Sequence, residues 1–311
     1  MGDPGFWMTD QASAIAPEVD WLFHFVHIVS LILFVAVIGA GIYFMIRYRR
    51  RDEREVPGPV KESAFVEAGL IIGPTLLVLV VFTWGFQLFL RQVTPPPDAY
   101  EIKVRAKQWA FEFEYPNGTV VGGDLHVPGD RPIKLSMTSI DVLHSMFLPA
   151  MRAKYDIIPG RYTTVWFDPT NDGTFELFCT EYCGASHSGM IANVVVQPYD
   201  EFDEWLSNQN TDDMPLPELG AKLYQQQACQ TCHSADGTPG VGPTFAGLWG
   251  QSARPLEDGS SVAVDADYLY ESIVNPSAKI AEGYMPLMPA SYASLSERQV
   301  SALIEYIKTL Q

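Results

Sequence analysis

Two long stretches without charged side chains constrain the fold of this 311-residue chain more than any other feature. No Asp, Glu, Lys or Arg occurs between Trp21 and Ile46, nor between Ala68 and Leu90. A helix needs about 20 mostly apolar residues to cross a bilayer, and both stretches reach that length. Buried helices of soluble proteins seldom run so far without a polar face. The sequence therefore predicts two transmembrane helices, at about 21–46 and 68–90, in a hairpin that covers residues 21–93.

The charges that flank these stretches predict the orientation of the hairpin. The connection carries five arginines in the run RYRRRDER, namely Arg47, Arg49, Arg50, Arg51 and Arg54. Positive charge in a short connecting loop marks the cytoplasmic side of a membrane. Acidic residues precede the first stretch, which therefore lacks the basic leader of a signal peptide and is expected to be an uncleaved anchor. We expect an N-terminal tail (1–20) and everything after Leu90 to lie outside the cytoplasm.

The net charge of −17 is concentrated toward the C-terminus. Residues 200–311 contain 16 acidic and 5 basic side chains, which amounts to −11 of that total. An acidic surface argues against nucleic acid or anionic lipid as a partner. It suits a partner with a basic docking face, although solubility alone would explain the charge equally well.

Between the second apolar stretch and residue 205 the pattern is that of an all-β domain. The proline run TPPPDAY ends the helix, and the domain is expected to cover residues 94–205. Within 101–115 the apolar alternation changes parity near Lys107–Gln108, which predicts a bulge or a change of face in one strand. Further strands are expected in 131–139, 144–151, 161–169, 173–180 and 190–198. Short strands at this spacing predict a sandwich or a Greek-key barrel.

The remainder of the chain has the pattern of a small all-α domain. An acidic helix from Asp200 leads into a polar, proline-bearing linker (206–217), and the helical domain is expected at 218–311. Ser296 and Gln299 have the spacing of a capping box, followed by apolar residues at helical intervals. The expected fold class is therefore a multidomain membrane protein with a helical hairpin, an all-β domain and an all-α domain.

All four cysteines fall into two short constellations, of which the first is FCTEYCGASHSGM. It places Cys179 and Cys183 near His187 and Met190, and soft thiolate and thioether ligands with imidazole suit copper. A mononuclear blue-copper site needs one cysteine, so the two thiolates are explained if they bridge two copper ions. His144 is the candidate for a second histidine. Two alternatives remain open: a disulfide between the two cysteines, and a zinc site that would leave the methionine without a role.

The second constellation is C-x-x-C-H, the attachment signature of a c-type heme. Cys229 and Cys232 would bind the porphyrin through thioether bonds, and His233 would supply an axial nitrogen. The sixth ligand is expected to be a methionine, for which Met285 and Met288 in GYMPLMPA compete.

Two apolar spans followed by LHSMFLPAMRAKYDIIPGR and CTEYCGASHSGM resemble subunit II of the heme–copper cytochrome c oxidases, over residues 20–205. The resemblance implies a cupredoxin-like Greek-key domain with the binuclear copper centre CuA. The ligands of this centre that the resemblance implies are His144, Cys179, Cys183, His187, Met190 and the backbone carbonyl of Glu181. It also implies that the Glu181 side chain binds a magnesium ion shared with subunit I.

The same resemblance assigns roles to two residues outside the copper site. Trp109 matches the tryptophan through which electrons enter from cytochrome c, although Ala110 and Phe111 follow it where the family usually has further aromatic residues. Glu67, seven residues before Pro74, matches a glutamate at the mouth of a proton channel. The family commonly has a tryptophan between these two residues, and AGLIIGP has none.

Residues 217–311 resemble the small monoheme class I cytochromes c. In that family the loop that contains Gly242 and Pro243 packs on the proximal side, where a backbone carbonyl orients the histidine, here His233. The G-Y-x-x-x-M-P spacing of related fused domains favours Met288 over Met285 as the axial ligand.

Together these resemblances imply subunit II of a heme-c-fused (caa-type) oxidase in a bacterial inner membrane. It would pass electrons from a donor cytochrome or upstream complex through heme c and CuA to subunit I, for oxygen reduction coupled to proton translocation. A subunit III is also expected. The chain's six histidines supply no oxygen-reducing site within its spans. Two alternatives are the corresponding subunit of a nitric oxide reductase and a freestanding membrane electron carrier.

Overall fold

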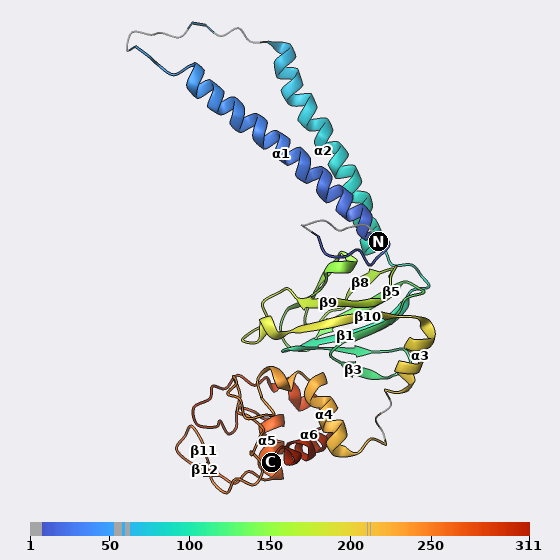
Figure 1. The fold of residues 1–311 in the computed structure, drawn as a ribbon, viewed down its shortest axis with the longest axis vertical. Coiled ribbons are helices and arrows are strands. Elements are labelled where there is room, and N and C mark those ends of the chain that lie inside the picture. Colours follow the sequence, from blue (N-terminus) through green and yellow to red (C-terminus); the bar gives the residue numbers. More distant parts are fainter. Residues whose placement is uncertain (1–7, 53–57, 60–62, 210, 212) are drawn as a thin grey trace.

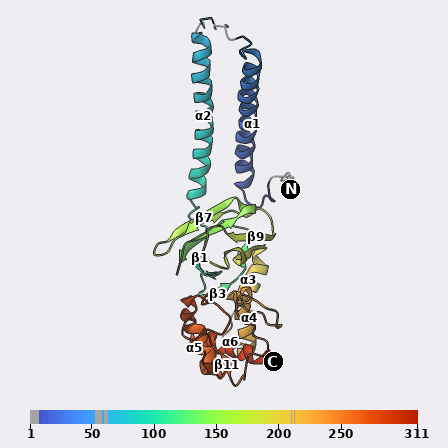
Figure 2. The same ribbon diagram turned by 90° about the vertical axis from the view of Figure 1, so that its left-hand side faces the viewer.

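The computed structural model describes residues 8–52, 58–59, 63–209, 211 and 213–311. Part of the expected tail (1–7), Arg54 of the connecting loop and positions 210 and 212 of the expected linker lie outside the described residues. The described chain is elongated: a helix pair, a β domain and a helical domain follow one another along its long axis (Figures 1 and 2). The β domain therefore lies between the membrane anchor and the C-terminal domain.

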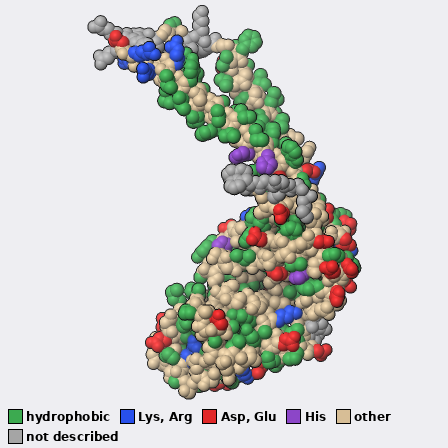
Figure 3. All heavy atoms as spheres, viewed as in Figure 1, with side chains coloured by type: hydrophobic (Ala, Val, Ile, Leu, Met, Phe, Trp, Pro, Cys, Tyr) green, Lys and Arg blue, Asp and Glu red, His purple; other side chains and the backbone are tan. Residues whose placement is uncertain are grey.

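The two apolar stretches form the helices α1 (Ala16–Arg47) and α2 (Ala64–Val93), each longer than the uncharged stretch that predicted it. Their apolar windows are not buried within the chain and are apolar enough to cross a membrane. Apolar side chains cover the pair, and basic ones gather at the end remote from the β domain (Figure 3). A buried ion pair fastens the near end, since Arg152 Nε lies 2.7 Å from Asp20 Oδ1.

Two five-stranded sheets form the β domain. One has the spatial order β3 (Val120–Gly122), β2 (Ala110–Glu114), β1 (Tyr100–Lys107), β5 (Ile133–Ser139) and β8 (Thr163–Phe167). The other has the order β4 (Leu125–Pro128), β10 (Ile191–Gln197), β9 (Gly173–Cys179), β6 (His144–Leu148) and β7 (Ala153–Ile157). One hydrophobic cluster draws alternate residues from both sheets, as expected where two sheets bury their inner faces against each other.

The prediction of one bulged strand over 101–115 was wrong. The segment forms two strands, β1 and β2, which pair antiparallel with Lys107 opposite Ala110. The chain reverses direction at Gln108 and Trp109, and the reversal produces the change of parity. Ile102 on β1 and Phe113 on β2 therefore both point into the core.

Four helices follow the last strand of the two sheets: α3 (Tyr199–Ser207), which packs on the β domain, and α4 (Leu216–Gln226), α5 (Ala266–Val274) and α6 (Glu297–Thr309). A short two-stranded pair, β11 (Arg254–Pro255) and β12 (Ser261–Val262), and the 3-10 segments η1 (Pro149–Met151), η2 (His187–Gly189), η3 (Cys229–Thr231) and η4 (Ala290–Ser294) complete the described elements. The capping box at Ser296 is confirmed, with both of its hydrogen bonds present. The apolar residues that follow it are buried in a second hydrophobic cluster, which forms the core of the C-terminal domain.

Candidate metal centres

The first candidate centre forms where two neighbouring strands of one sheet meet. β6 begins at His144 and β9 ends at Cys179, and the pairing of Met146 with Cys179 holds these strand ends together. With Cys183 from the following loop, they offer ligand atoms that all lie within 4.8 Å of one another. All three residues are buried. The paired strands and the loop after β9 therefore bring half of the expected ligand set together.

The loop after β9 adds the other expected ligands. The Sγ atom of Cys183 lies 3.4 Å from His187 Nδ1 and 3.9 Å from Met190 Sδ. The backbone carbonyl of Glu181 lies 3.4 Å from Cys179 Sγ. The structure therefore brings all six atoms expected to bind CuA into one connected cluster.

The two thiols of this cluster are free rather than joined as a disulfide. Their Sγ atoms are 3.8 Å apart, within hydrogen-bonding distance of each other. The contact with Cys183 lowers the pKa of Cys179 well below its ordinary value, against the effect of burial. Two adjacent buried thiols, of which one loses its proton readily, are suited to bind soft metal ions as thiolates.

Two residues that the sequence did not single out support the cluster. Asp141 accepts a hydrogen bond from His144 Nε2 at 2.9 Å and directs the other ring nitrogen, Nδ1, toward Cys179. Gln108 donates from its backbone to Asp141 and from its side chain to the carbonyl of Cys183, at 2.7 and 2.6 Å. Such outer contacts orient metal-binding histidines and tune their basicity. The sequence DVLH carries the spacing, but the partnership needs the turn between β5 and β6.

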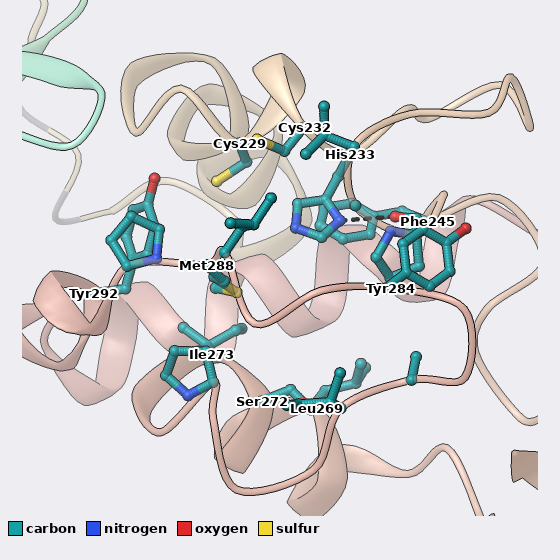
Figure 4. A pocket seen from close by; sticks show the side chains of 18 of the residues that line it. Cys229, Cys232, His233, Phe245, Leu269, Ser272, Ile273, Tyr284, Met288 and Tyr292 are labelled. Atoms are coloured by element: carbon teal, nitrogen blue, oxygen red, sulfur yellow. Dashed lines mark hydrogen bonds between the residues drawn. The ribbon is translucent and has the colours of Figure 1, made fainter. Parts of the chain in front are cut away.

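The second candidate centre is a crevice in the C-terminal domain (Figure 4). Cys229, Cys232 and His233 line one side, and Leu269, Ser272 and Ile273 of α5 lie across from them. The crevice has an empty volume of about 1270 Å³, open mouth included. Its lining is mostly apolar with a few polar groups, as is usual for a cofactor site.

His233 is held in position by contacts on its far side. Its Nδ1 donates to the carbonyl of Pro243 at 2.7 Å, and its ring stacks on Phe245, which confirms the expected proximal loop. A Cβ at Gly242 would approach His233 Cε1 to 2.6 Å, so only glycine fits there. Burial lowers the pKa of His233 and favours the neutral imidazole, whose Nε2 is then free to bind a metal.

Unpaired polar atoms inside the crevice fit a cofactor with carboxylates. Arg254 Nε and Ser272 Oγ are buried without a hydrogen-bond partner among the described residues, and both residues line the crevice. Heme propionates would satisfy both groups. Met288 packs against the domain's hydrophobic cluster, whereas Met285 is 70% exposed.

The two remaining expected functional residues occupy different surroundings. Trp109 is only 5% exposed and lies where the β domain meets the heme crevice, whose lining it joins. Glu67 lies in the first turn of α2, exposed, far along the chain from either candidate centre.

Comparison with known proteins matches each part of this chain to a protein family. Residues 3–88 match the transmembrane domain of cytochrome c oxidase subunit II, residues 119–198 its periplasmic domain, and residues 217–311 the cytochrome c family. The alternative cytochrome c oxidase subunit 2 of Bradyrhizobium diazoefficiens is 31% identical over 58% of this chain and 76% of that protein. This chain belongs to the cytochrome c oxidase subunit 2 family.

Other members of the family align over different lengths. The subunit 2 of Alkalihalophilus pseudofirmus is 27% identical over 95% of this chain and 89% of that protein, so the alignment includes the C-terminal domain. The crystal structure of the periplasmic domain of subunit II of the Bradyrhizobium japonicum oxidase is 28% identical, covers 37% of this chain and 96% of that one, and has a TM-score of 0.36.

Membership of the cytochrome c oxidase subunit 2 family establishes the general role of the chain. It is a membrane-anchored, electron-input component of an oxidase and associates with subunit I, where oxygen is reduced. The subunit II domain implies copper in the form of CuA, and the cytochrome c domain implies heme. The residues of both sites fit these groups, because the first cluster has the donor set for copper and the crevice has the anchors and unpaired donors for heme.

Proposed function

We propose that His144, Cys179, Cys183, His187, Met190 and the carbonyl of Glu181 bind CuA in this subunit. The observation that supports this assignment most strongly is the continuity of the six atoms, with neighbouring separations of 3.4–3.9 Å and the thiols buried. Bound there, a binuclear copper pair supplies one-electron transfer with little rearrangement. The role of the chain is to keep the ligands fixed, which Asp141 and Gln108 do from outside the cluster.

The heme would be attached by Cys229 and Cys232 and ligated by His233 and Met288. Met288 is favoured over Met285 because it faces the hydrophobic cluster, whereas the other methionine is mostly in solvent. When bound, the heme supplies reversible one-electron chemistry, and histidine–methionine ligation raises its potential. Electrons would then enter the copper site from the side of Trp109, which lies between the crevice and the copper loop.

Three assignments concern the surroundings of the subunit. The Glu181 side chain would bind a magnesium ion together with subunit I, and Glu67 would lie at the mouth of a proton channel. The arginines after α1 support a cytoplasmic connection, with the tail, the metal domains and both termini on the outer face of a bacterial inner membrane. A subunit III and a donor cytochrome or upstream complex complete the proposed assembly.

The proposed domains follow these functions. They are the tail (1–20), the hairpin (21–93), the CuA domain (94–205), the linker (206–217) and the heme domain (218–311). The strands and the change from strand to helix support this division, as does the position of α3 against β4.

The test is a metal and heme analysis of the complex purified in mild detergent, combined with oxygen uptake. We expect two coppers and one covalently bound heme per chain, a mixed-valence copper EPR signal and oxygen consumption. Zinc in place of copper, or a disulfide between Cys179 and Cys183 in the active complex, would overturn the copper assignment.

A further inference from the structure

A buried lysine joins the β domain to the heme domain. Lys107, the last residue of β1, is 1% exposed, although lysine is almost never fully buried unless its charge is paired. Its Nζ lies 2.6 Å from Glu112 Oε1 on β2 and also donates to the side-chain carbonyl of Gln227, which follows α4 in the heme domain. The pairing of this charge is therefore shared between two domains.

The heme domain completes the environment of this lysine. Gln227 donates from Nε2 to Glu112 Oε1 at 3.2 Å, so its amide bridges both charges. Tyr292 places its ring 5.5 Å from Lys107 Nζ and donates its hydroxyl to the carbonyl of Gln227 at 2.9 Å. We call Lys107, Glu112, Gln227 and Tyr292 the Lys107 network.

The same two strands carry an exposed counterpart of the buried pair. Lys103 on β1 lies directly opposite Glu114 on β2, with Nζ and Oε1 2.8 Å apart, and the lysine side chain is 62% exposed. Both lysines lie on the same face of β1, because they are four residues apart in a strand of period two. The cover supplied by the heme domain is therefore what distinguishes the network from an ordinary surface ion pair.

Backbone contacts fix the position of the heme domain near this network. A Cβ on Gly122 of β3 would lie 2.2 Å from the carbonyl oxygen of Gln226, so the two backbones touch there. Nearby, the Oγ of Ser186, next to His187, lies 3.5 Å from the Sγ of Cys232. The heme attachment loop thus lies directly on the copper loop.

We propose that the Lys107 network is a docking lock that holds the heme domain where its heme faces the copper site. The proposal rests on the assignment of heme c and CuA given above. A rotation or shift of the heme domain that kept this region covered would separate the Gln227 amide from both Lys107 and Glu112 and leave buried polar groups with fewer partners, which is costly. The network therefore selects one docked position and, with it, one electron path past Trp109.

One consequence concerns the external electron donor. In the docked position Trp109 is 5% exposed and lines the heme crevice, so its ring is not open to another protein. The external donor must therefore deliver electrons to the heme domain, and only a released heme domain would open the β domain to direct reduction.

The test uses the purified complex and two variants that leave every proposed metal ligand in place. Lys107→Met removes the shared charge, and Gly122→Leu inserts a side chain against the Gln226 carbonyl.

After flash photoreduction of the heme by a ruthenium photosensitiser, we expect both variants to slow electron transfer from heme to copper at least about tenfold, because breaking a buried pair displaces the docked state strongly. The ferric heme should also accelerate the EPR relaxation of the copper less than in the wild type, a readout that depends on distance rather than turnover.

Lys103→Met is the matched control, since it removes the exposed pair on the same two strands. It should leave the rate within about twofold of the wild type, as expected of a surface ion pair. Wild-type rates and relaxation in Lys107→Met would overturn the lock, even if Gly122→Leu, which tests only the backbone contact between the domains, slowed the transfer. If Lys107→Met fails to assemble, Gln227→Ala, which removes the heme-domain amide from the network and keeps the Lys107–Glu112 pair, decides the question. Absence of the copper or heme signal from the wild-type complex would instead refute the proposed function.

Discussion

The copper cluster and the heme crevice differ in how much of each site the polypeptide completes by itself. At the copper cluster the ligand atoms already contact one another at 3.4–3.9 Å, held by paired strands and a short loop. At the heme crevice the two cysteines and His233 line one side, and α5 lies across from them. Buried polar atoms of Arg254 and Ser272 there have no hydrogen-bond partner within the part of the chain that the structure describes. A small metal centre can be organised by backbone geometry, whereas a large cofactor forms part of the core that surrounds it.

The strongest test of this contrast is Cys183→Ser at the copper cluster. Because this sulfur contacts Cys179, His187 and Met190, its loss should abolish the mixed-valence copper EPR signal and reduce oxygen uptake more than about 100-fold, a loss of more than about 2.7 kcal/mol in transition-state terms. Heme content, measured from the reduced absorption spectrum, should not change. Ser188→Ala, an exposed change in the same loop, is the control. A retained binuclear signal in Cys183→Ser would contradict the ligand assignment.

The heme crevice is tested by exchanging its two candidate methionines in turn. Met288→Leu should remove the thioether-to-iron absorption band and lower the heme potential, because Met288 is the methionine packed against the core of the domain. The heme should stay covalently bound through Cys229 and Cys232. Met285→Leu serves as the matched comparison, since its side chain is 70% exposed. If only Met285→Leu removed the band, the assignment would be wrong.

Asp141→Asn sharpens the comparison, because it leaves every copper ligand in place. Asparagine keeps an oxygen for the hydrogen bond but lacks the charge that orients and polarises His144. We expect copper affinity to fall about 10- to 100-fold, measured by competition with a chelator. Asp156→Asn removes a carboxylate whose partner, Lys154, is exposed, and it should have no such effect. Equal affinities in the two variants would show that the ring needs no charged partner.

The smallest expected effect is a pH dependence of the contact between the two regions. Burial raises the pKa of Glu112, but the neighbouring Lys107 and Arg105 charges outweigh burial, so the net pKa lies below the ordinary value of 4.5. A carboxyl group whose pKa is lowered by pairing stabilises the paired state fully at pH values above its ordinary pKa. This stabilisation is lost as the pH falls through the lowered pKa. Electron transfer from heme to copper should therefore be constant near neutral pH and decline below about 4.5.

The groups that face Glu112 are Lys107 and Arg105 from β1 and the uncharged Gln227 from the heme domain, with Tyr292 beyond. Stopped-flow or flash measurements between pH 7 and pH 4 would record the decline. Glu112→Gln should flatten this profile, and Glu114→Gln on the exposed side of the same strand should not. An acid decline of equal size in all three proteins would assign the titration to another group.

Much of this architecture could be predicted from the sequence because local patterns determine it. The length of the two uncharged stretches predicted both membrane helices, and the alternation of apolar and polar residues predicted five of the strands. The capping box predicted the start of α6. The ligands cluster in short motifs, since Cys179 to Met190 and Cys229 to His233 each lie within one loop. Motif chemistry also carries the family membership that the comparisons established.

Other features depend on which distant segments meet, and alternation alone does not encode that. The reversal at Gln108 and Trp109 produces the same change of parity as a bulge, and only the pairing of β1 with β2 distinguishes them. Asp141 can orient a copper ligand only because folding places its partner, His144, beside Cys179 on another strand.

The sequence by itself determined the anchors, the two kinds of domain and the chemistry of the two metal-binding motifs, because each depends on residues close together in the chain. The tertiary structure decided that Lys107, 120 positions before Gln227 in the chain, is buried against it, and that Trp109 is buried beside the heme crevice. The physical reason is that a charged strand end can face water or a docked domain with the same local sequence. Its burial depends on the surface that the folded heme domain brings to it.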